Sequence, residues 1–184
     1  MPKIVSTSIG KSTFMIVKGR GIVRSAINKK PINNPIEITE LGLVGDHQAD
    51  NIAHGGPDQA VYVYPVEHYA FWETDKKFKH GYFGENLTVS DILEQNVYID
   101  DIWVIGEVTL QVTRQRTPCL KFNAKMKSPI AGKAMMVSGK TGWYLRVLVP
   151  GIVNAGDEIQ IVPGPRISNI LSRVTEHIES WVAL

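Results

Sequence analysis

Apolar and polar residues alternate with a period of two along much of this chain. Residues 108–113 read Val-Thr-Leu-Gln-Val-Thr, and residues 144–149 read Tyr-Leu-Arg-Val-Leu-Val. This period predicts strands that bury one face and expose the other. Shorter runs of strand type lie at residues 4–9, 14–17, 22–27, 36–38, 61–64, 103–105 and 158–162.

Turn-forming residues separate these runs, as at Lys18–Gly21, Asn33–Pro35, Gly55–Asp58 and Pro150–Gly151. Many short strands between turns are typical of a closed or strongly curved sheet, because closure removes exposed strand edges. We therefore expect a mainly β fold, a β-barrel with a few short helices and a C-terminal helix.

Helical periodicity is confined to four segments. Pro65 suits a first helical turn, and the residues after it predict a helix to about Lys79. Shorter helices are expected after Cys119, through Met126, and around residues 130–137. The clearest pattern is an apolar stripe near the end of the chain, which has to pack on the barrel, on another chain or on a further segment. The stripe comprises Ile167, Ile170, Leu171, Val174, Ile178 and Trp181.

Composition limits the class of protein. The chain has 184 residues, of which 43% are hydrophobic and 21% charged, as expected for one globular domain. Pro163–Pro165 offers one boundary, between a barrel domain over residues 1–165 and a C-terminal helix over 166–184. A net charge of +2 gives no overall attraction to nucleic acid.

The location of the protein is predicted from what the sequence lacks. A single cysteine excludes an intrachain disulfide framework and favours a reducing compartment. The N-terminus has no signal-peptide core, and no apolar run approaches the ~20 residues that span a bilayer. We expect a soluble, cytoplasmic protein with neither a membrane nor a nucleic acid as partner.

The single cysteine, Cys119, follows a predicted strand within a basic segment. If the strand alternation continues, Arg114 and Arg116 emerge on the face of the buried residues. Inward arginines are costly in a packed core, so we expect them to line the mouth of a cavity. Cationic neighbours favour the thiolate, which attacks electrophiles and binds metals. A structural, buried cysteine is the alternative, and the residues alone leave both interpretations open.

A cluster of titratable residues comes earlier in the chain, among four glycines. It comprises Asp46, His47, Asp50, His54 and Asp58. Histidine and aspartate at such spacing could ligate a metal, but the spacing matches no strong metal motif. These side chains could instead satisfy backbone groups of a long loop.

Two weaker signals and several absences complete the pattern. Glu85 and Asn86 could orient a ligand or cap a turn, and strand parity favours a solvent-facing Arg146. The chain contains no phosphate-binding glycine-rich loop and no GxSxG nucleophile elbow. Its aromatic residues are scattered and lack the basic interleaving of an RNA-binding sheet.

Five ordered blocks, spread over about Lys18 to Val162, resemble one known family. The chain is similar to the MOSC domain, named for the C-terminal domain of molybdenum-cofactor sulfurases, and most of all to its stand-alone bacterial YiiM-type branch. The blocks are Gly42–Asp46 with Asp50, His54–Asp58 with Tyr64–Tyr69, Gly84–Leu87, Arg116–Cys119 and Gly142–Val147.

This resemblance implies a β-barrel with its cysteine in a cleft, where Cys119 is the metal ligand of a molybdopterin-type molybdenum cofactor. It implies reduction of N-hydroxylated small molecules such as hydroxylamino-purines, a detoxification reaction, with electrons from a separate flavoprotein. Cys119, His54 and Asp58 become the candidate catalytic residues, the latter two as proton shuttles. The candidates for binding the anionic cofactor are Arg116, Arg146, Asn86, Arg114 and Lys121.

Two other functions remain open at this point. A sulfur carrier or cofactor-binding module that holds a persulfide on Cys119 needs the same accessible, electropositive thiol. A metal-dependent hydrolase built on Asp46, His47, Asp50 and His54 ranks third. The sequence decides neither the physiological substrate nor whether the chain forms a homodimer.

Overall fold

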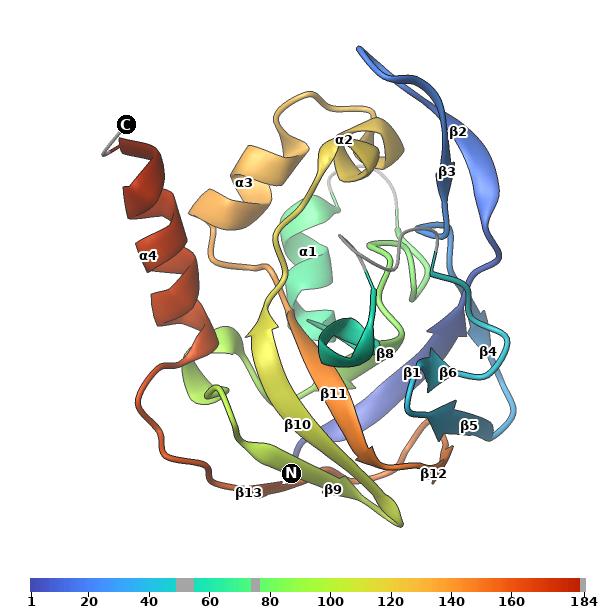
Figure 1. Ribbon diagram of the computed structural model, residues 1–184, viewed down its shortest axis with the longest axis vertical. Coiled ribbons are helices and arrows are strands. Elements are labelled where there is room, and N and C mark those ends of the chain that lie inside the picture. Colours follow the sequence, from blue (N-terminus) through green and yellow to red (C-terminus); the bar gives the residue numbers. More distant parts are fainter. Residues whose placement is uncertain (49–54, 74–76, 183–184) are drawn as a thin grey trace.

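The computed structural model describes residues 1–48, 55–73 and 77–182, and strands dominate it (Figure 1). Eight strands form one curled sheet in which all neighbours are antiparallel except β7 and β8. The expected mainly β fold with few helices is confirmed. In sheet order the strands are β13 (Gln160–Val162), β9 (Ile102–Ile105), β10 (Val108–Gln115), β11 (Trp143–Val149), β7 (Val61–Pro65), β8 (Leu87–Ser90), β1 (Lys3–Ile9) and β4 (Lys30–Ile32).

The sheet curls until β1, the strand next to one end, meets the segment that precedes β13 at the other end. The backbone N–H of Ile4 donates to the carbonyl of Asp157 at 2.9 Å, and Lys3 forms an antiparallel bridge with Glu158. These contacts join β1 to the residues just before β13. Closure of this kind satisfies backbone groups that an open sheet edge would expose.

Two smaller sheets complete the β structure. One has the order β12 (Gly151–Val153), β5 (Ile36–Thr39) and β6 (Gly42–Leu43). The other is a hairpin of β2 (Thr13–Val17) and β3 (Gly21–Ser25), which projects beyond the barrel beside α2 (Figure 1). Its turn is the Lys18–Gly21 segment expected from the sequence.

The inner face of the barrel holds the main core. Val108, Leu110 and Val112 are fully buried, which confirms the alternation read along β10. Trp103 and Trp143 pack edge to face, with ring centres 5.7 Å apart. Full burial of each aliphatic side chain contributes about 1.5–3 kcal/mol, so this face provides much of the stability.

A second, largely aromatic cluster lies on the outer face of β7, where helices cover it. Its buried members are Tyr62, Tyr64, Tyr69, Phe83, Phe122, Ala131 and Met135. The helices are α1 (Tyr69–Trp72), α2 (Leu120–Met126), α3 (Ala131–Val137) and α4 (Ile170–Val182), with one-turn 3-10 helices η1 (Pro57–Gln59), η2 (Val66–His68) and η3 (Glu94–Asn96).

The helix after Pro65 is shorter than expected, because α1 ends at Trp72. The backbone of Glu73 is extended, and its carboxylate accepts hydrogen bonds from the Phe78 N–H and from Lys77, each at 2.9 Å. The prediction of a helix to Lys79 was therefore wrong. These side-chain contacts replace the helical hydrogen bonds that the apolar spacing had suggested.

The C-terminal helix α4 buries only part of its apolar stripe. Ile170 and Val174 are buried where α4 packs on β10 and η3. Ile167, by contrast, is 90% exposed ahead of the helix, and Trp181 is 44% exposed near its end. None of the helices in the described part of the chain is both long and apolar enough to cross a membrane.

Candidate functional site

A β-bulge in β10 sets the direction of the basic segment before the cysteine. Val112 pairs with Leu145 but Arg114 pairs with Tyr144, so one extra residue lies on β10. Beyond the bulge Gln115 is buried and Arg114 is exposed. The prediction that both arginines continue the buried inner face was wrong, because the bulge inverts the alternation. Arg116 is nevertheless buried, against the outer aromatic cluster.

Arg116 is a buried cation that faces a small cavity. Its guanidinium lies 5.0 Å from the ring centre of Tyr62 and 4.6 Å from that of Phe122, and Nη1 donates to Met135 Sδ at 2.9 Å. Within the described residues no carboxylate lies within ion-pair distance of it. Buried charges are normally paired, so this guanidinium is suited to an anionic ligand.

The small cavity beside Arg116 has a volume of about 100 Å³. Burial raises the pKa of Tyr62 and of Tyr144, and the charge of Arg116 opposes this rise in both. Both phenols are therefore neutral at physiological pH. The lining residues are Ser25, Ala26, Ile27, Lys29, His47, Gln48, Tyr62, Gly84, Arg116, Thr117, Cys119, Lys121 and Tyr144.

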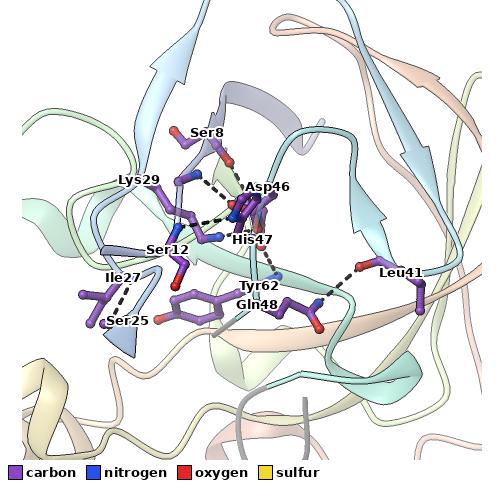
Figure 2. A network of polar contacts seen from close by, with 12 residues as sticks. Ser8, Ser12, Ser25, Ile27, Lys29, Leu41, Asp46, His47, Gln48 and Tyr62 are labelled. Carbon is purple, nitrogen blue, oxygen red and sulfur yellow. Dashed lines mark hydrogen bonds and ion pairs between the residues drawn. The ribbon is translucent and has the colours of Figure 1, made fainter. Parts of the chain in front are cut away.

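A second cation, Lys29, is held in the cavity wall by a buried network (Figure 2). Lys29 forms an ion pair with Asp46, whose other contacts are the Asn86 amide at 2.8 Å and the Gly10 N–H at 2.7 Å. Burial lowers the pKa of Lys29, although the charge of Asp46 opposes it. The network thus places an ammonium group against the cavity.

A larger cavity of about 570 Å³ adjoins the small one. The two share Thr117, Cys119 and Lys121, so the cysteine lies where they meet. Cys119 has an extended backbone directly before α2, and its carbonyl accepts the Phe122 N–H at 2.9 Å. The lining residues are Val17, Arg20, Val23, Thr117, Pro118, Cys119, Leu120, Lys121, Asn123, Gly132, Lys133, Met136 and Trp181.

Gly142, directly before β11, allows the start of that strand to pack closely on β7 and on the basic segment. Its φ is +66°, and a Cβ atom there would lie 2.2 Å from the Val63 carbonyl oxygen, so only glycine fits. The Gly142 carbonyl accepts the Arg116 N–H at 3.2 Å, and its N–H donates to Glu94 at 2.8 Å. Glu94 is in turn paired with the buried His68 at 2.7 Å. The start of β11 and the basic segment are therefore held together.

Lys125 ties α2, and with it the cysteine, to the segment before β4. Its ammonium donates to Asn28 Oδ1 at 2.8 Å and lies 4.6 Å from the ring centre of Tyr82. Burial lowers the pKa of Lys125 from 10.5 to about 8, with an opposing effect of Glu85. The folded protein therefore releases this proton at a lower pH than the unfolded chain does.

This difference predicts a pH dependence of stability. Between about pH 8 and 10.5 the unfolded chain holds the proton that folded Lys125 has released, so its contribution to the free energy of unfolding rises with pH. Urea midpoints measured across this range should rise more steeply for the parent than for Lys125→Met. Lys127→Met, at an exposed position just after the same helix, is the control. Equal slopes in the parent and Lys125→Met would contradict the assignment.

Several residues predicted for the site lie elsewhere. Arg146 pairs with Asp58, with Nε 2.7 Å from Oδ1, and the two side chains are 43% and 60% exposed. Neither these two residues nor Arg114 or Asn86 lines either cavity. Asn86 acts on the cavity through Asp46 instead. His54 falls outside the described residues.

The described part of the chain does not support the hypothesis of a metal site. It contains no group of three His, Cys, Asp or Glu side chains placed to hold a metal ion. The Asp46 carboxylate is occupied by Lys29, Asn86 and the Gly10 backbone. Asp50, which the hypothesis also included as a ligand, lies outside the described residues.

Sequence reasoning missed part of the cavity wall. Tyr62 and Tyr144 occupy outward positions of two strands that pair with each other, where a large aromatic residue is a weak sign of an outer packed layer. Lys29 and Gln48 carry no local signal. Their place in the wall depends on contacts between distant segments, such as Lys29 with Asp46.

The fold and site define a β-barrel domain whose cysteine lies in a cation-lined cleft. The family model of the MOSC domain matches residues 50–160, and this chain belongs to that family. It is 40% identical over 151 residues to Protein YiiM of Escherichia coli (strain K12), covering 79% of this chain and 66% of that one. The YiiM-type resemblance is thereby confirmed.

Two further comparisons extend this result. The crystal structure of YiiM from Geobacillus stearothermophilus matches with a TM-score of 0.81 and 31% identity, over 98% of this chain and 85% of that one. A protein named "Reductase" from Gibberella moniliformis is 35% identical over 151 residues, which make up 79% of this chain but 27% of the fungal one. The chain thus spans just under two thirds of the E. coli relative and about a quarter of the fungal one.

Proposed function

We propose that this protein is a molybdenum-cofactor-dependent reductase of N-hydroxylated small molecules, with Cys119 as the molybdenum ligand. The observation that carries the proposal is the position of Cys119, where two cavities meet beside the buried Arg116, a cation with no carboxylate partner in the described structure. Membership of the MOSC family and a relative named reductase support a redox role.

The donor set fits this cofactor, which combines a thiolate-seeking metal with an organic anion. Thiolate is a soft ligand, and arginine and lysine recognise phosphate. A volume of 570 Å³ lies within the usual ~300–1,000 Å³ of small-molecule sites, whereas 100 Å³ holds only a few water molecules. We therefore assign the organic part of the cofactor to the larger cavity, with Arg20, Lys121 and Lys133 as its cations.

The small cavity then receives the N–OH group of the substrate. When bound, the cofactor supplies the two electrons that reduce the N–O bond. The reaction also consumes two protons and releases the amine and water. Lys29 holds a proton at Nζ in the cavity wall, and burial lowers its pKa toward the range of an effective acid. Arg116 offsets negative charge beside Cys119.

The proton-shuttle role assigned from sequence to Asp58 and His54 thus passes to Lys29 in this proposal. Asp58 is paired with Arg146 away from both cavities. Asp46 and Asn86 act as positioning residues, because they hold Lys29 without lining a cavity themselves. The electrons come from a separate flavoprotein in this scheme.

The test is the composition and activity of the protein purified anaerobically from a host that makes molybdenum cofactor. We expect near-stoichiometric molybdenum and pterin, and conversion of 6-hydroxylaminopurine to adenine with dithionite-reduced methyl viologen as donor. A protein without molybdenum and without turnover would refute the proposal. If its intact mass then showed one added sulfur on Cys119, the sulfur-carrier function would replace it.

A further inference from the structure

The β2–β3 hairpin exposes an apolar face to solvent. Its register pairs Phe14 with Arg24 and Ile16 with Ile22, so these four residues share one face, here called the outer hairpin face. Phe14, Ile16 and Ile22 are 73%, 78% and 73% exposed. Large apolar side chains that gather on one exposed face, with a polar rim, mark interaction sites in soluble proteins.

The opposite face of the same hairpin belongs to the site. Val17 is buried, and both Val17 and Val23 line the larger cavity that contains Cys119. The hairpin therefore forms a wall, one sheet thick, between that cavity and solvent. A protein docked on the outer hairpin face would be separated from the cavity by about 10 Å.

The charged side chains around this face are basic. Lys11, Lys18, Arg20 and Arg24 are exposed along the hairpin and its flanks. The first 36 residues contain seven of the 20 basic residues and none of the 18 acidic ones. The hairpin is thus a basic element on a chain whose remaining residues are net acidic. It complements a partner with acidic side chains around an apolar centre.

The basic charges and the single aromatic ring of this face indicate which kind of molecule can bind there. A second copy joined about a two-fold axis would bring the same basic rim against itself, which costs free energy. A single-stranded nucleic acid would need several stacking rings, but Phe14 is the only aromatic residue on the face. An acidic protein satisfies both the apolar centre and the basic rim.

We propose that the outer hairpin face is the docking surface for an acidic electron-transfer protein that reduces the site behind it. This inference rests on the proposed reductase function, since it assigns a surface to the electron donor. Docking there places the donor against the wall of the cavity beside Cys119. The electrostatic rim steers the encounter, and Phe14, Ile16 and Ile22 provide the contact.

The experiment compares a small donor with a protein donor. Dithionite-reduced methyl viologen diffuses into the cavity without docking, whereas reduced flavodoxin, an acidic flavoprotein, has to dock. The variants are Phe14→Ser with Ile22→Ser, and Lys18→Glu with Arg24→Glu. The control is Lys3→Glu with Lys79→Glu, which makes the same change of net charge at exposed positions outside the hairpin.

We expect turnover with methyl viologen to be unchanged in all variants, because none of the altered residues lines a cavity. The flavodoxin-driven rate should fall by about tenfold or more in both hairpin variants, but not in the control. In the parent that rate should also fall with rising salt. This pattern would support the docking surface.

Other outcomes separate the two proposals. Methyl viologen turnover without any flavodoxin-driven turnover, or with equal flavodoxin rates in parent and hairpin variants, would overturn the docking surface and leave the reductase function intact. Absence of methyl viologen turnover in the parent would refute the reductase function and the donor role with it. Hairpin-dependent binding to phosphatidylserine vesicles, with unchanged flavodoxin rates, would replace the protein partner with a membrane.

Discussion

Replacing Cys119 with serine is expected to abolish retention of the molybdenum cofactor while leaving the fold unchanged. Serine is nearly isosteric, and the backbone carbonyl of residue 119 can still accept the Phe122 N–H that begins α2. A neutral hydroxyl, however, is a much weaker ligand than a thiolate for a thiolate-preferring metal. Molybdenum and pterin content per chain, measured beside thermal unfolding, checks both parts.

Two results for Cys119→Ser would contradict this expectation. Full molybdenum content and turnover in the variant would refute the ligand assignment. Loss of the cofactor together with an unfolding temperature far below that of the cofactor-free parent would mean that Cys119 is a structural residue, the alternative left open by the sequence. Cys119 is only partly buried, which favours the first expectation over this one.

Replacing Arg116 with methionine is expected to weaken cofactor binding by about 10- to 100-fold, because the Arg116 charge stabilises the Cys119 thiolate that would hold the metal, and interactions with charged groups contribute ~1.5–3 kcal/mol. Methionine keeps apolar contact with Tyr62 and Phe122 and removes the guanidinium, with its charge and its hydrogen bond to Met135. Stability of the apoprotein should be maintained or should increase, because a buried cation with no carboxylate partner among the described residues is costly. Titration of the apoprotein with isolated cofactor measures the affinity.

Arg146→Met is the matched control for this experiment. The chemical change is identical, but Arg146 forms a partly exposed ion pair with Asp58 and lines neither cavity. Such surface pairs contribute about 0–1 kcal/mol, so we expect little change in stability and none in cofactor affinity. Equal losses of affinity in the two variants would refute the special role of Arg116 and restore the family-based assignment of Arg146.

The network around Lys29 contains residues of the family blocks that position a cavity residue without lining a cavity themselves. Asp46 and Asn86 belong to two of the blocks that carry the MOSC resemblance, yet neither lines a cavity. Their side chains instead hold Lys29, which no block contains. Residues of a family pattern can thus act through a neighbour, which a single sequence does not reveal.

The exposed apolar residues of the hairpin also depart from what the local sequence pattern predicts. The run over 14–17 predicts a strand, and β2 forms there. Strand periodicity implies one buried and one exposed face, and the exposed face here carries Phe14 and Ile16 instead of polar residues. That departure from the usual pattern carries the inference of a docking surface.

The sequence by itself determined the mainly β fold, most strands, the last three helices and the position of Cys119 in a basic segment. These features depend on local periodicity and on neighbours along the chain. The tertiary structure alone decided that Arg116 and not Arg114 reaches the cavity, because the bulge arises from pairing with β11. It also decided that Arg146 turns to Asp58 and that Lys29 joins the wall. Such contacts join residues far apart in sequence, where register and burial are set by partners that no local pattern encodes.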